Sequence, residues 1–354
     1  ASPGDTVIVL PGVYYESVDI DGDLTLASMD ILSPNSHYLE TIIDGVGHGR
    51  VIDMIGGCGE VNIYGLTIRN GDGTGISTST YTASCGDINI QNCVITGFGN
   101  TAIAMGDEDD NVYISNCIIN NTKSTNDWGV VTVSSSNTNV EIDHTVIFSH
   151  LPNTPLGIRL TSGESTLTIS NSIIWGFDES ILATNGGVVS VSNSCIENGW
   201  LGTNVIESNP EFQHPAAGNF RLSMMSPCIG AGSEYDISSF DLDGNPRPLP
   251  AGSIKDMGAY EHYLDTPVLF HDGRTIYVST DGSDVSGSGT SVDPFASIQK
   301  GIDLALNNDV VLVSPGTYHE NIIIGDKDIL VTSEYFSSID TSTINATIID
   351  GDSS

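Results

Sequence analysis

The chain has 354 residues, of which 39 are glycine, and 39% of its residues are hydrophobic whereas only 16% are charged. Lys and Arg number 10 against 45 Asp and Glu, so the formal net charge is −35. A surface this acidic repels phosphate, which excludes nucleic acid and anionic membrane surfaces as partners. No hydrophobic run approaches the ~18 residues of a membrane span, which argues against membrane insertion.

Six copies of one short phrase follow the first 60 residues. They read VNIYGLTI (61–68), INIQNCVI (88–95), VYISNCII (112–119), VEIDHTVI (140–147), LTISNSII (167–174) and VSVSNSCI (189–196). Each copy is an alternating β segment, a polar corner and a second short apolar β segment. A period of 22 to 28 residues with this alternation predicts a solenoid in which each repeat is one coil. A leucine-rich-repeat horseshoe is excluded, because L-x-x-L-x-L and a helical back are missing. We therefore predict an all-β fold, a right-handed parallel β-helix.

Stacking of the coils should align equivalent side chains. The corner position holds Gly65, Asn92, Asn116, His144, Asn171 and Asn193. We predict that four of these form a ladder of hydrogen-bonded side chains, namely Asn92, Asn116, Asn171 and Asn193. The inward-facing residues should also stack in register, and they include Ile63, Leu66, Ile90, Ile114, Ile142, Ile169 and Val191. Roughly eight to ten coils are expected in this β-helix.

The remainder of the chain closes one unit and begins another. We expect residues 1–262 to form the first β-helix unit, with 197–262 as its closing region. Residues 263–274 form a short join, and 275–354 contain the cap and first coils of a second unit. Phe295, Ile298, Ile302 and Leu306 recur at helical spacing after Pro294, so 295–306 predict a short helix that covers the open end of this second β-helix.

The second unit repeats the start of the first. DVVLVSPGTYHEN at 309–321 matches DTVIVLPGVYYES at 5–17, and the match continues through DILVTS and DLTLAS to a shared TIIDG. The offset of 304 to 306 residues shows that a whole domain is repeated, not a coil. The first copy has only ASPG where the second has a helix. We therefore expect the sequence to be a window on a tandem array with a period of about 305 residues, whose units abut.

These words also resemble known families. VIVLPGVYYE and IYVSTDGSD…DPFASIQKGID…VVLVSPGTYHEN are similar to the opening of secreted proteins in the pectate-lyase-like β-helix superfamily. SPCIGAGSEYDISSFDLDGNPRPLPAGSIKDMGAYEH, at 226–262, resembles the end of "choice-of-anchor Q" β-helix repeat proteins. The resemblance implies a β-helix in an extracellular or cell-surface location. It implies no single activity, because the superfamily contains lyases, hydrolases, epimerases and adhesins.

Two words are similar to catalytic motifs of that superfamily. Asp143-His144 resembles the W-I-D-H word of pectate lyases, but the aromatic residue is missing and His144 occupies the corner position. The basic residues nearest to it, Arg159 and Lys123, are isolated. The word GHGR at 47–50 resembles the G-H-G of polygalacturonases, which also need clustered aspartates that no neighbouring word supplies. We interpret both words as structural and assign no catalytic residue.

Acidic turns are the candidate metal sites. They lie at 19–23, 70–73, 106–111 and 241–245. The last, DLDGN, offers Asp241, Asp243 and Asn245 as oxygen ligands around a glycine turn, which makes calcium the one ion that the sequence favours. The alternative is a turn whose carboxylates cap backbone N–H groups. No cofactor is required by any other motif.

The six cysteines fall into three pairs. One pair stands three residues before an alternating segment in adjacent coils, a second pair follows the corner asparagine, and the third joins the last coil to the closing region. Adjacent coils lie about 4.8 Å apart, within the range that a disulfide accepts. We predict disulfides Cys58–Cys85, Cys93–Cys117 and Cys195–Cys228, in an oxidising extracellular compartment. The alternative is a column of reduced, buried thiols.

The domain repeat and the absence of a convergent catalytic group favour a structural role. The chain is expected to be a unit of a secreted, fibrous or adhesive surface protein that joins identical units head to tail, through residues 210–274 of one unit and 275–308 of the next. Two alternatives stay open. One is a polysaccharide lyase or hydrolase acting on acidic glycans. The other is a non-catalytic module for surface glycans, with Trp128, Trp175 and Trp200 as stacking residues.

Overall fold

The structure is a computed structural model. It describes residues 1–32, 37–55, 59–78, 86–106, 111–120, 122, 128–151, 154–233, 239–267, 273–335 and 341–351. The chain divides into two compact units, unit 1 at Ala1–Val268 and unit 2 at Leu269–Ser354. Their boundary falls inside the segment 263–274, and each unit is described by itself. In the described residues, no helix is both long enough and apolar enough to cross a membrane.

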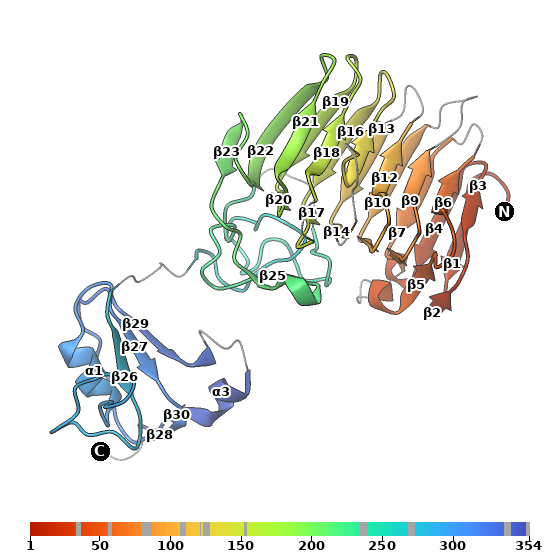
Figure 1. The fold of residues 1–354 in the computed structure, drawn as a ribbon. Coiled ribbons are helices and arrows are strands. Elements are labelled where there is room, and N and C mark those ends of the chain that lie inside the picture. The colour runs from red at the N-terminus through yellow and green to blue at the C-terminus, as the bar shows by residue number, and fades with distance from the viewer. Residues whose placement is uncertain are drawn as a thin grey trace. The chain divides into compact units, whose positions relative to one another are not determined.

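Unit 1 is a right-handed parallel β-helix whose coils stack along its length (Figure 1). The first sheet contains β1 (Asp5–Val9), β4 (Leu24–Ser28), β7 (Val61–Tyr64), β10 (Asp87–Gln91), β13 (Asn111–Ser115), β16 (Asn139–Asp143), β19 (Thr166–Ser170) and the first part of β22 (Val188–Ile196). β23 (Thr203–Ile206) pairs with β22.

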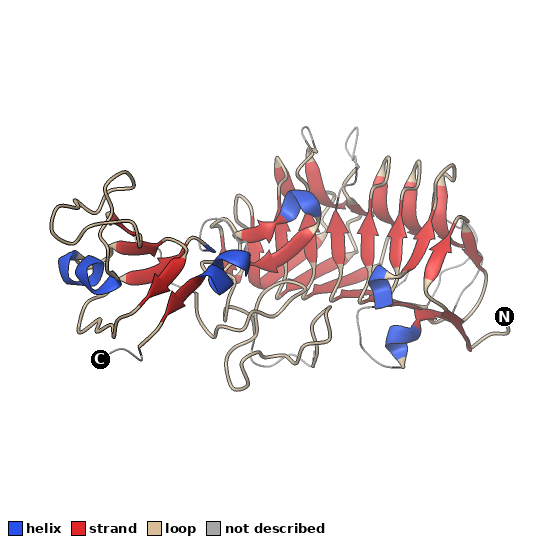
Figure 2. Cartoon of the chain, turned by 90° about the horizontal axis from the view of Figure 1, so that it is seen from below, coloured by secondary structure: helices blue, strands red, loops and turns tan. Residues whose placement is uncertain are grey.

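The second sheet contains β2 (Gly12–Tyr14), β5 (Thr41–Asp44), β8 (Thr67–Arg69), β11 (Val94–Thr96), β14 (Ile118–Asn120), β17 (Val146–Phe148), β20 (Ile173–Trp175) and the end of β22. The third sheet contains β3 (Val18–Ile20), β6 (Arg50–Met54), β9 (Thr74–Thr78), β12 (Thr101–Met105), β15 (Val131–Val133), β18 (Leu156–Leu160) and β21 (Glu179–Ala183). Figure 2 shows these strands lying side by side from coil to coil. The short 3-10 helices η1 (Met29–Ile31) and η2 (His37–Leu39) lie between β4 and β5.

The predicted inward column is confirmed. In the first sheet Ile63 pairs in register with Ile90, and the column continues through the neighbouring strands as Ile114, Ile142, Ile169 and Val191. All six side chains are buried in one continuous core. Alternation explains this, because every second residue of a strand points to the same face and each coil covers the apolar face of the next.

The corner is formed by a left-handed residue in each coil. The φ angles there are 68° at Gly65, 55° at Asn92, 57° at Asn116, 45° at His144 and 49° at Asn171, and Asn193 continues the series. Glycine and asparagine adopt this region at little cost. Asparagine therefore suits the corner mainly because its backbone adopts a positive φ angle.

The ladder that connects coils lies one residue later than predicted. The backbone N–H of Cys117 donates to Thr145 Oγ1 (3.3 Å), that of Thr145 to Ser172 Oγ (3.1 Å), and that of Ser172 to Ser194 Oγ (3.1 Å). Cys93 joins the same column, since its N–H donates to Cys117 Sγ at 3.5 Å. Among the four predicted corner asparagines, one pair of side chains in adjacent coils is hydrogen-bonded, with Asn116 Nδ2 donating to Asn92 Oδ1 (3.0 Å).

The closing region covers the outer face of the second sheet. It contains an antiparallel pair, β24 (Phe212–His214) and β25 (Asn219–Leu222), joined by the 3-10 helix η3 (Pro215–Ala217). Phe220 and Met257 pack against outward-facing Val146, Phe148 and Ile173 in a second hydrophobic cluster. The segment thus protects a sheet face that would otherwise lie open to water.

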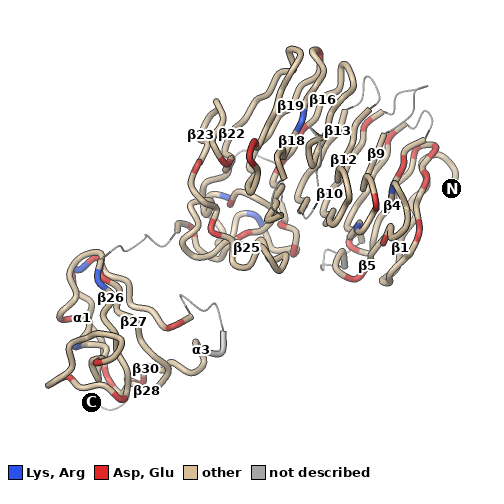
Figure 3. The backbone as a smooth tube through the Cα atoms, viewed as in Figure 1, with Lys and Arg blue, Asp and Glu red and all other residues tan. Residues whose placement is uncertain are grey.

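Unit 2 begins a second β-helix. β26 (Thr275–Val278), β27 (Val310–Val313) and β29 (Leu330–Ser333) form a parallel sheet, and β28 (Gly316–Tyr318) pairs with β30 (Thr347–Ile349). The predicted helix is found as α1 (Ile298–Leu304), which packs its buried face on β26 and β27. A second helix, α3 (Thr341–Ala346), precedes β30. Asp and Glu residues are distributed along the backbone of both units and outnumber Lys and Arg (Figure 3).

Candidate functional site

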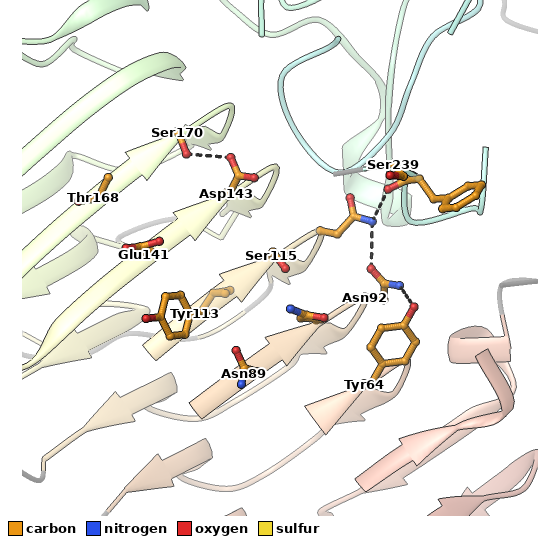
Figure 4. Close-up of a pocket in the computed structure, with 14 residues that line it drawn as sticks. Tyr64, Asn89, Asn92, Tyr113, Ser115, Glu141, Asp143, Thr168, Ser170 and Ser239 are labelled. Atoms are coloured by element: carbon orange, nitrogen blue, oxygen red, sulfur yellow. Dashed lines mark hydrogen bonds between the residues drawn. The ribbon is translucent and has the colours of Figure 1, made fainter. Parts of the chain in front are cut away.

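A groove of about 660 Å³ lies on the outer face of the first sheet, across β7, β10, β13, β16 and β19. Its floor is made by the outward-facing residues that alternate with the buried isoleucines. Two such residues contribute from each of β10, β13, β16 and β19, for example Tyr113 and Ser115 of β13 or Glu141 and Asp143 of β16, and β7 contributes Tyr64. Figure 4 shows these side chains projecting from successive strands. The groove therefore presents aromatic rings, amides, hydroxyls and carboxylates in rows.

Hydrogen bonds between coils hold the rows in place. Asn89 Nδ2 donates to Asn62 Oδ1 (3.0 Å), and Asn92 Nδ2 donates to the Tyr64 hydroxyl (2.7 Å; Figure 4). At the start of the strands, Asn139 Nδ2 donates to Asn111 Oδ1 at 3.0 Å. The amide ladders of this protein are thus on the outer face of the first sheet. Their bonds fix the tyrosine and amide orientations before any ligand arrives, which reduces the entropy lost on binding.

One wall of the groove comes from the closing region, at Ser239 and Phe240. Asn116 holds this wall, because its Nδ2 donates to the Phe240 carbonyl at 3.0 Å. Asn116 Oδ1 in turn accepts from Arg247 Nη2 (2.9 Å), and Arg247 forms a fully buried ion pair with Glu261 at 2.6 Å. Removing one partner of a buried pair leaves an uncompensated charge. The wall is therefore anchored in the body of the closing region.

The other predicted corner asparagines also bind this region. Asn171 Oδ1 accepts from the Ser233 N–H (2.7 Å), and Asn193 Nδ2 donates to the Gly232 carbonyl (3.2 Å). The corner column is thus a line of amides along which residues 232, 233 and 240 attach. Asn171 Nδ2 donates to Asp143 Oδ1 at 2.8 Å, so Asn171 links the groove floor to the closing region.

The Asp143-His144 pair has a structural geometry. His144 is fully buried at the corner, and its Nδ1 contacts Asp143 Oδ2 at 3.0 Å. Burial alone would raise the pKa of Asp143, but the contacts with His144, Ser170 and Asn171 outweigh it and lower the pKa to about 2. Asp143 therefore stays ionised at the groove floor, while the imidazole is shielded from any ligand in the groove.

The charge of the groove limits what it can bind. Its described lining residues include two carboxylates, Glu141 and Asp143, and no Lys or Arg. Arg159 lies instead on β18 of the third sheet, with its guanidinium 5.9 Å from the Trp128 ring centre. Lys123 lies outside the described residues. A uronate ligand would meet like charge here, whereas a neutral glycan could stack on Tyr64 or Tyr113 and hydrogen-bond to the amides.

The predicted calcium ligands belong to two different networks. Asp241 accepts hydrogen bonds from Asn245 N (2.7 Å), Asn245 Nδ2 (3.0 Å) and Glu261 N (2.9 Å). Burial raises the pKa of Asp241 in spite of these bonds. Asp243 instead accepts from Arg221 Nε at 2.9 Å. The described residues contain no group of three or more His, Cys, Asp or Glu arranged to hold a metal ion. In this geometry the Asp241 carboxylate caps backbone N–H groups of the turn, and the calcium site stays a prediction.

The described cysteines are free, buried thiols, in contrast to the predicted disulfides Cys93–Cys117 and Cys195–Cys228. Stacking does bring the first pair together, but each thiol acts as a member of the hydroxyl ladder. Cys93 Sγ donates to the Gln91 carbonyl (3.2 Å) and Cys117 Sγ to that of Ser115 (3.2 Å), as Ser172 Oγ does to Ser170. Burial raises the pKa of the Cys117 thiol, so it stays protonated. The predicted pair Cys58–Cys85 lies outside the described residues.

The remaining predicted residues lie away from the groove. Trp128, Trp175 and Trp200 do not line it, and Trp175 packs against the second hydrophobic cluster. His48 is in the turn between β5 and β6, where its carbonyl accepts the Asp72 N–H. Tyr64, Tyr113 and Phe240 line the groove but were not predicted from the sequence. Tyr64 and Tyr113 occupy outward positions of the repeated phrase, so its alternation could have identified them.

Comparison with known proteins finds only distant structural similarity. No family model matches the chain, and no curated protein matches it. Among solved structures, it is similar to a PL6 family alginate lyase, with 14% identity over 94% of this chain and a TM-score of 0.34. The chain spans 65% of that enzyme's length. A pectate lyase matches with 12% identity and a TM-score of 0.33, covering 74% of this chain and 89% of the enzyme. Likeness at this level carries no argument about activity.

Proposed function

We propose that this chain is a structural repeat unit of a secreted, fibrous or adhesive surface protein whose units join end to end. The duplicated first coil carries the proposal. β27 pairs with β29 as β1 pairs with β4, and β28 pairs with β30 as β2 pairs with β5. A chain that encodes the start of the same fold twice is suited to head-to-tail repetition, and such repetition gives a filament when it does not close into a ring.

The outer edge of β1 supplies a contact for this assembly. β1 is an edge strand of its sheet, and its side chains Val7 and Ile8 are 40% and 37% exposed. The equivalent residue of Val7 in unit 2 is Val311, which is fully buried beneath β26 and α1. Open apolar edges invite pairing with another chain. The proposal is supported by the second copy of this strand, β27, whose equivalent surface is covered by β26 and α1.

Sedimentation velocity of the full chain tests the proposal. We expect oligomers that grow with concentration and appear as linear particles by electron microscopy. Val7→Asp should shift the equilibrium to monomer, because a charge would be buried in the contact. The matched control Val46→Asp changes a residue that is 61% exposed in the turn after β5, outside the segments 210–274 and 275–308, and should leave assembly unchanged. A monomer at all concentrations would contradict the proposal.

The groove favours one second function, non-catalytic binding of a neutral glycan. Tyr64 and Tyr113 offer stacking surfaces, and the carboxyl groups of Glu141 and Asp143 disfavour uronates. We expect affinity electrophoresis to detect a neutral glucan in preference to polygalacturonate, and Tyr113→Ala to weaken this binding about tenfold. Release of unsaturated products from polygalacturonate or alginate, lost in Asp143→Asn, would instead support the lyase alternative.

A further inference from the structure

A second, smaller cavity of about 300 Å³ lies on the outer face of the second sheet and shares no lining residue with the groove. Its floor is formed by β11 and β14, through Val94, Thr96, Ile118 and Asn120. Residues of η2, of η3 with its C-cap Gly218, and Tyr260 complete it. The cavity therefore joins segments that are far apart in the sequence.

Its lining is uncharged. The described lining residues contain no Asp, Glu, Lys, Arg or His. Two carboxylates contact the lining residue Tyr38. Asp30 accepts its backbone N–H at 2.8 Å, and Asp243 accepts its hydroxyl at 3.3 Å and is paired with Arg221 at 2.9 Å. Two tyrosine hydroxyls meet at the base, where Tyr38 and Tyr260 are 3.3 Å apart. A charged ligand would lose its hydration here without gaining an opposite charge, so the cavity selects a neutral ligand.

Asn120 gives the cavity a specific requirement. It alternates with the inward-facing Ile119, so its side chain lies on the outer face of the sheet. The residue is only 3% exposed, and its Oδ1 accepts no hydrogen bond within the described residues. A buried acceptor without a donor costs about 1–3 kcal/mol. The next coil has Phe148 at the paired position, so the sheet accommodates an apolar residue there. The unsatisfied Asn120 amide therefore destabilises the protein in the absence of a ligand.

We propose that this cavity binds one neutral sugar residue, which donates a hydroxyl hydrogen bond to Asn120 Oδ1 and packs its C–H face on the apolar and tyrosine walls. The volume is at the small end for ligand sites, which limits the ligand to about one ring. An aromatic hydrocarbon would fill the space but would leave Asn120 unsatisfied. A sugar ring, free or at the end of a glycan, supplies both the donor and the apolar face. The site is independent of end-to-end assembly.

Saturation-transfer NMR on the full chain tests this. The probes are the methyl glycosides of glucose, galactose, mannose and N-acetylglucosamine, with maltose, cellobiose and lactose to distinguish an end residue from a free sugar. At least one probe should bind, and Asn120→Leu should weaken its binding at least tenfold. Thr332→Val, a substitution on β29 of unit 2 that lies in neither cavity, should leave it unchanged. Ala217→Trp, which blocks the exposed rim, should also abolish binding without affecting the fold.

Stability supplies the second measurement. If Asn120 Oδ1 receives a hydrogen bond only from a ligand, replacing Asn120 removes no bond from the free protein. The melting temperature of Asn120→Leu without sugar should then equal or exceed that of the wild type. A lower melting temperature would mean that the amide has a structural partner, and it would overturn the proposal. So would failure of every sugar probe, sugar binding that survives Ala217→Trp, or binding of indole and p-cresol in place of sugars.

Discussion

β1 in unit 1 and β27 in unit 2 have similar sequences, but one is exposed to solvent and the other is buried. Val7 of β1 is 40% exposed, whereas Val311 of β27 is fully buried. The difference is the cover, because β26 pairs along β27 and α1 packs on it. At the other end the relation is reversed. Ile43 of β5 is 2% exposed and pairs with Ile68 of the next coil, whereas its counterpart Ile349 is 48% exposed.

The comparison shows that a coil of this fold has no core of its own. The same strand sequence becomes a core strand or an open edge according to the element stacked on it. The burial of a strand residue, and therefore its sensitivity to substitution, is set by the element that stacks on its coil. Changes at equivalent positions of the two copies should have unequal effects, and the size of the inequality measures what the cover contributes.

The largest inequality is expected for a charge placed under the cover. Val311→Asp buries an unpaired carboxylate beneath α1 and should cost about 4 kcal/mol or more, enough to unfold unit 2. In the monomer, Val7→Asp should cost less than about 0.5 kcal/mol, because its side chain is solvated there. Hydrogen exchange of peptides from 310–318 and from 5–14 separates the two effects. Equal loss of protection in both variants would show that cover does not decide burial.

Removing the cover itself should convert β27 toward the state of β1. Ile302 of α1 is 1% exposed within the core of unit 2, so Ile302→Ala leaves a cavity and should cost about 3 kcal/mol. Amide protection of β27 should fall toward that of β1. The control Leu306→Ala changes a side chain that is 66% exposed and should cost well under about 1 kcal/mol. Unchanged exchange in Ile302→Ala would mean that β26 alone protects β27.

The third inequality concerns an acidic pair, Asp309 and its counterpart Asp5. Burial would raise the pKa of Asp309, but bonds from Arg274 and from the Leu306 N–H outweigh it and hold the pKa below its ordinary value. Since the folded pKa is the lower one, this stabilisation is present above about pH 4 and is lost as the pH falls through the folded value. Asp309→Asn should cost about 2 kcal/mol at neutral pH and flatten the acid limb of unit 2.

Asp5→Asn is the matched control for that measurement. Asp5 is exposed and accepts one bond, from the Ser2 N–H at 2.6 Å, so its loss should cost less than about 0.5 kcal/mol. Thermal unfolding between acid and neutral pH, followed by calorimetry, gives both values. A similar pH profile for the two variants would contradict the role of the Arg274 pair.

The sequence predicts most of the stacking, because alternation is local. The Ile63–Ile90 column follows from period-two burial, and the helix at 295–306 is present in shorter form. It begins after Ser297, whose side chain accepts the Lys300 N–H, and it ends before Ala305, whose backbone is extended. Physical rules for caps and periodicity therefore suffice wherever the partner of a residue is in the same or the next coil.

Long-range partners could not be predicted in the same way. Asn116 and Asn171 suit the left-handed corner, but their amides bind Phe240 and Ser233, which no repeat places beside them. Cys117 follows the corner in phase with Thr145, and that phase indicates a hydroxyl-like ladder position as readily as a disulfide. The groove depends on the same long-range docking, because its wall comes from the closing region. A one-coil period contains no information about that region.

The smallest inequality should come from a bond that both copies make. Tyr14 donates its hydroxyl to the Leu10 carbonyl (3.0 Å), and the equivalent Tyr318 donates to Ser314 (2.8 Å). Tyr318 is 3% exposed, so Tyr318→Phe leaves a shielded carbonyl without its donor and should cost about 1 kcal/mol. In Tyr14→Phe, water can replace the lost donor, and the cost should be a few tenths of that. Denaturant unfolding followed by hydrogen exchange measures both. The Tyr318 hydroxyl also contacts the Val278 carbonyl of β26 at 3.4 Å. A ratio near one would therefore assign the energy to the local turn, and a ratio well above one would assign it to burial and to the contact with β26.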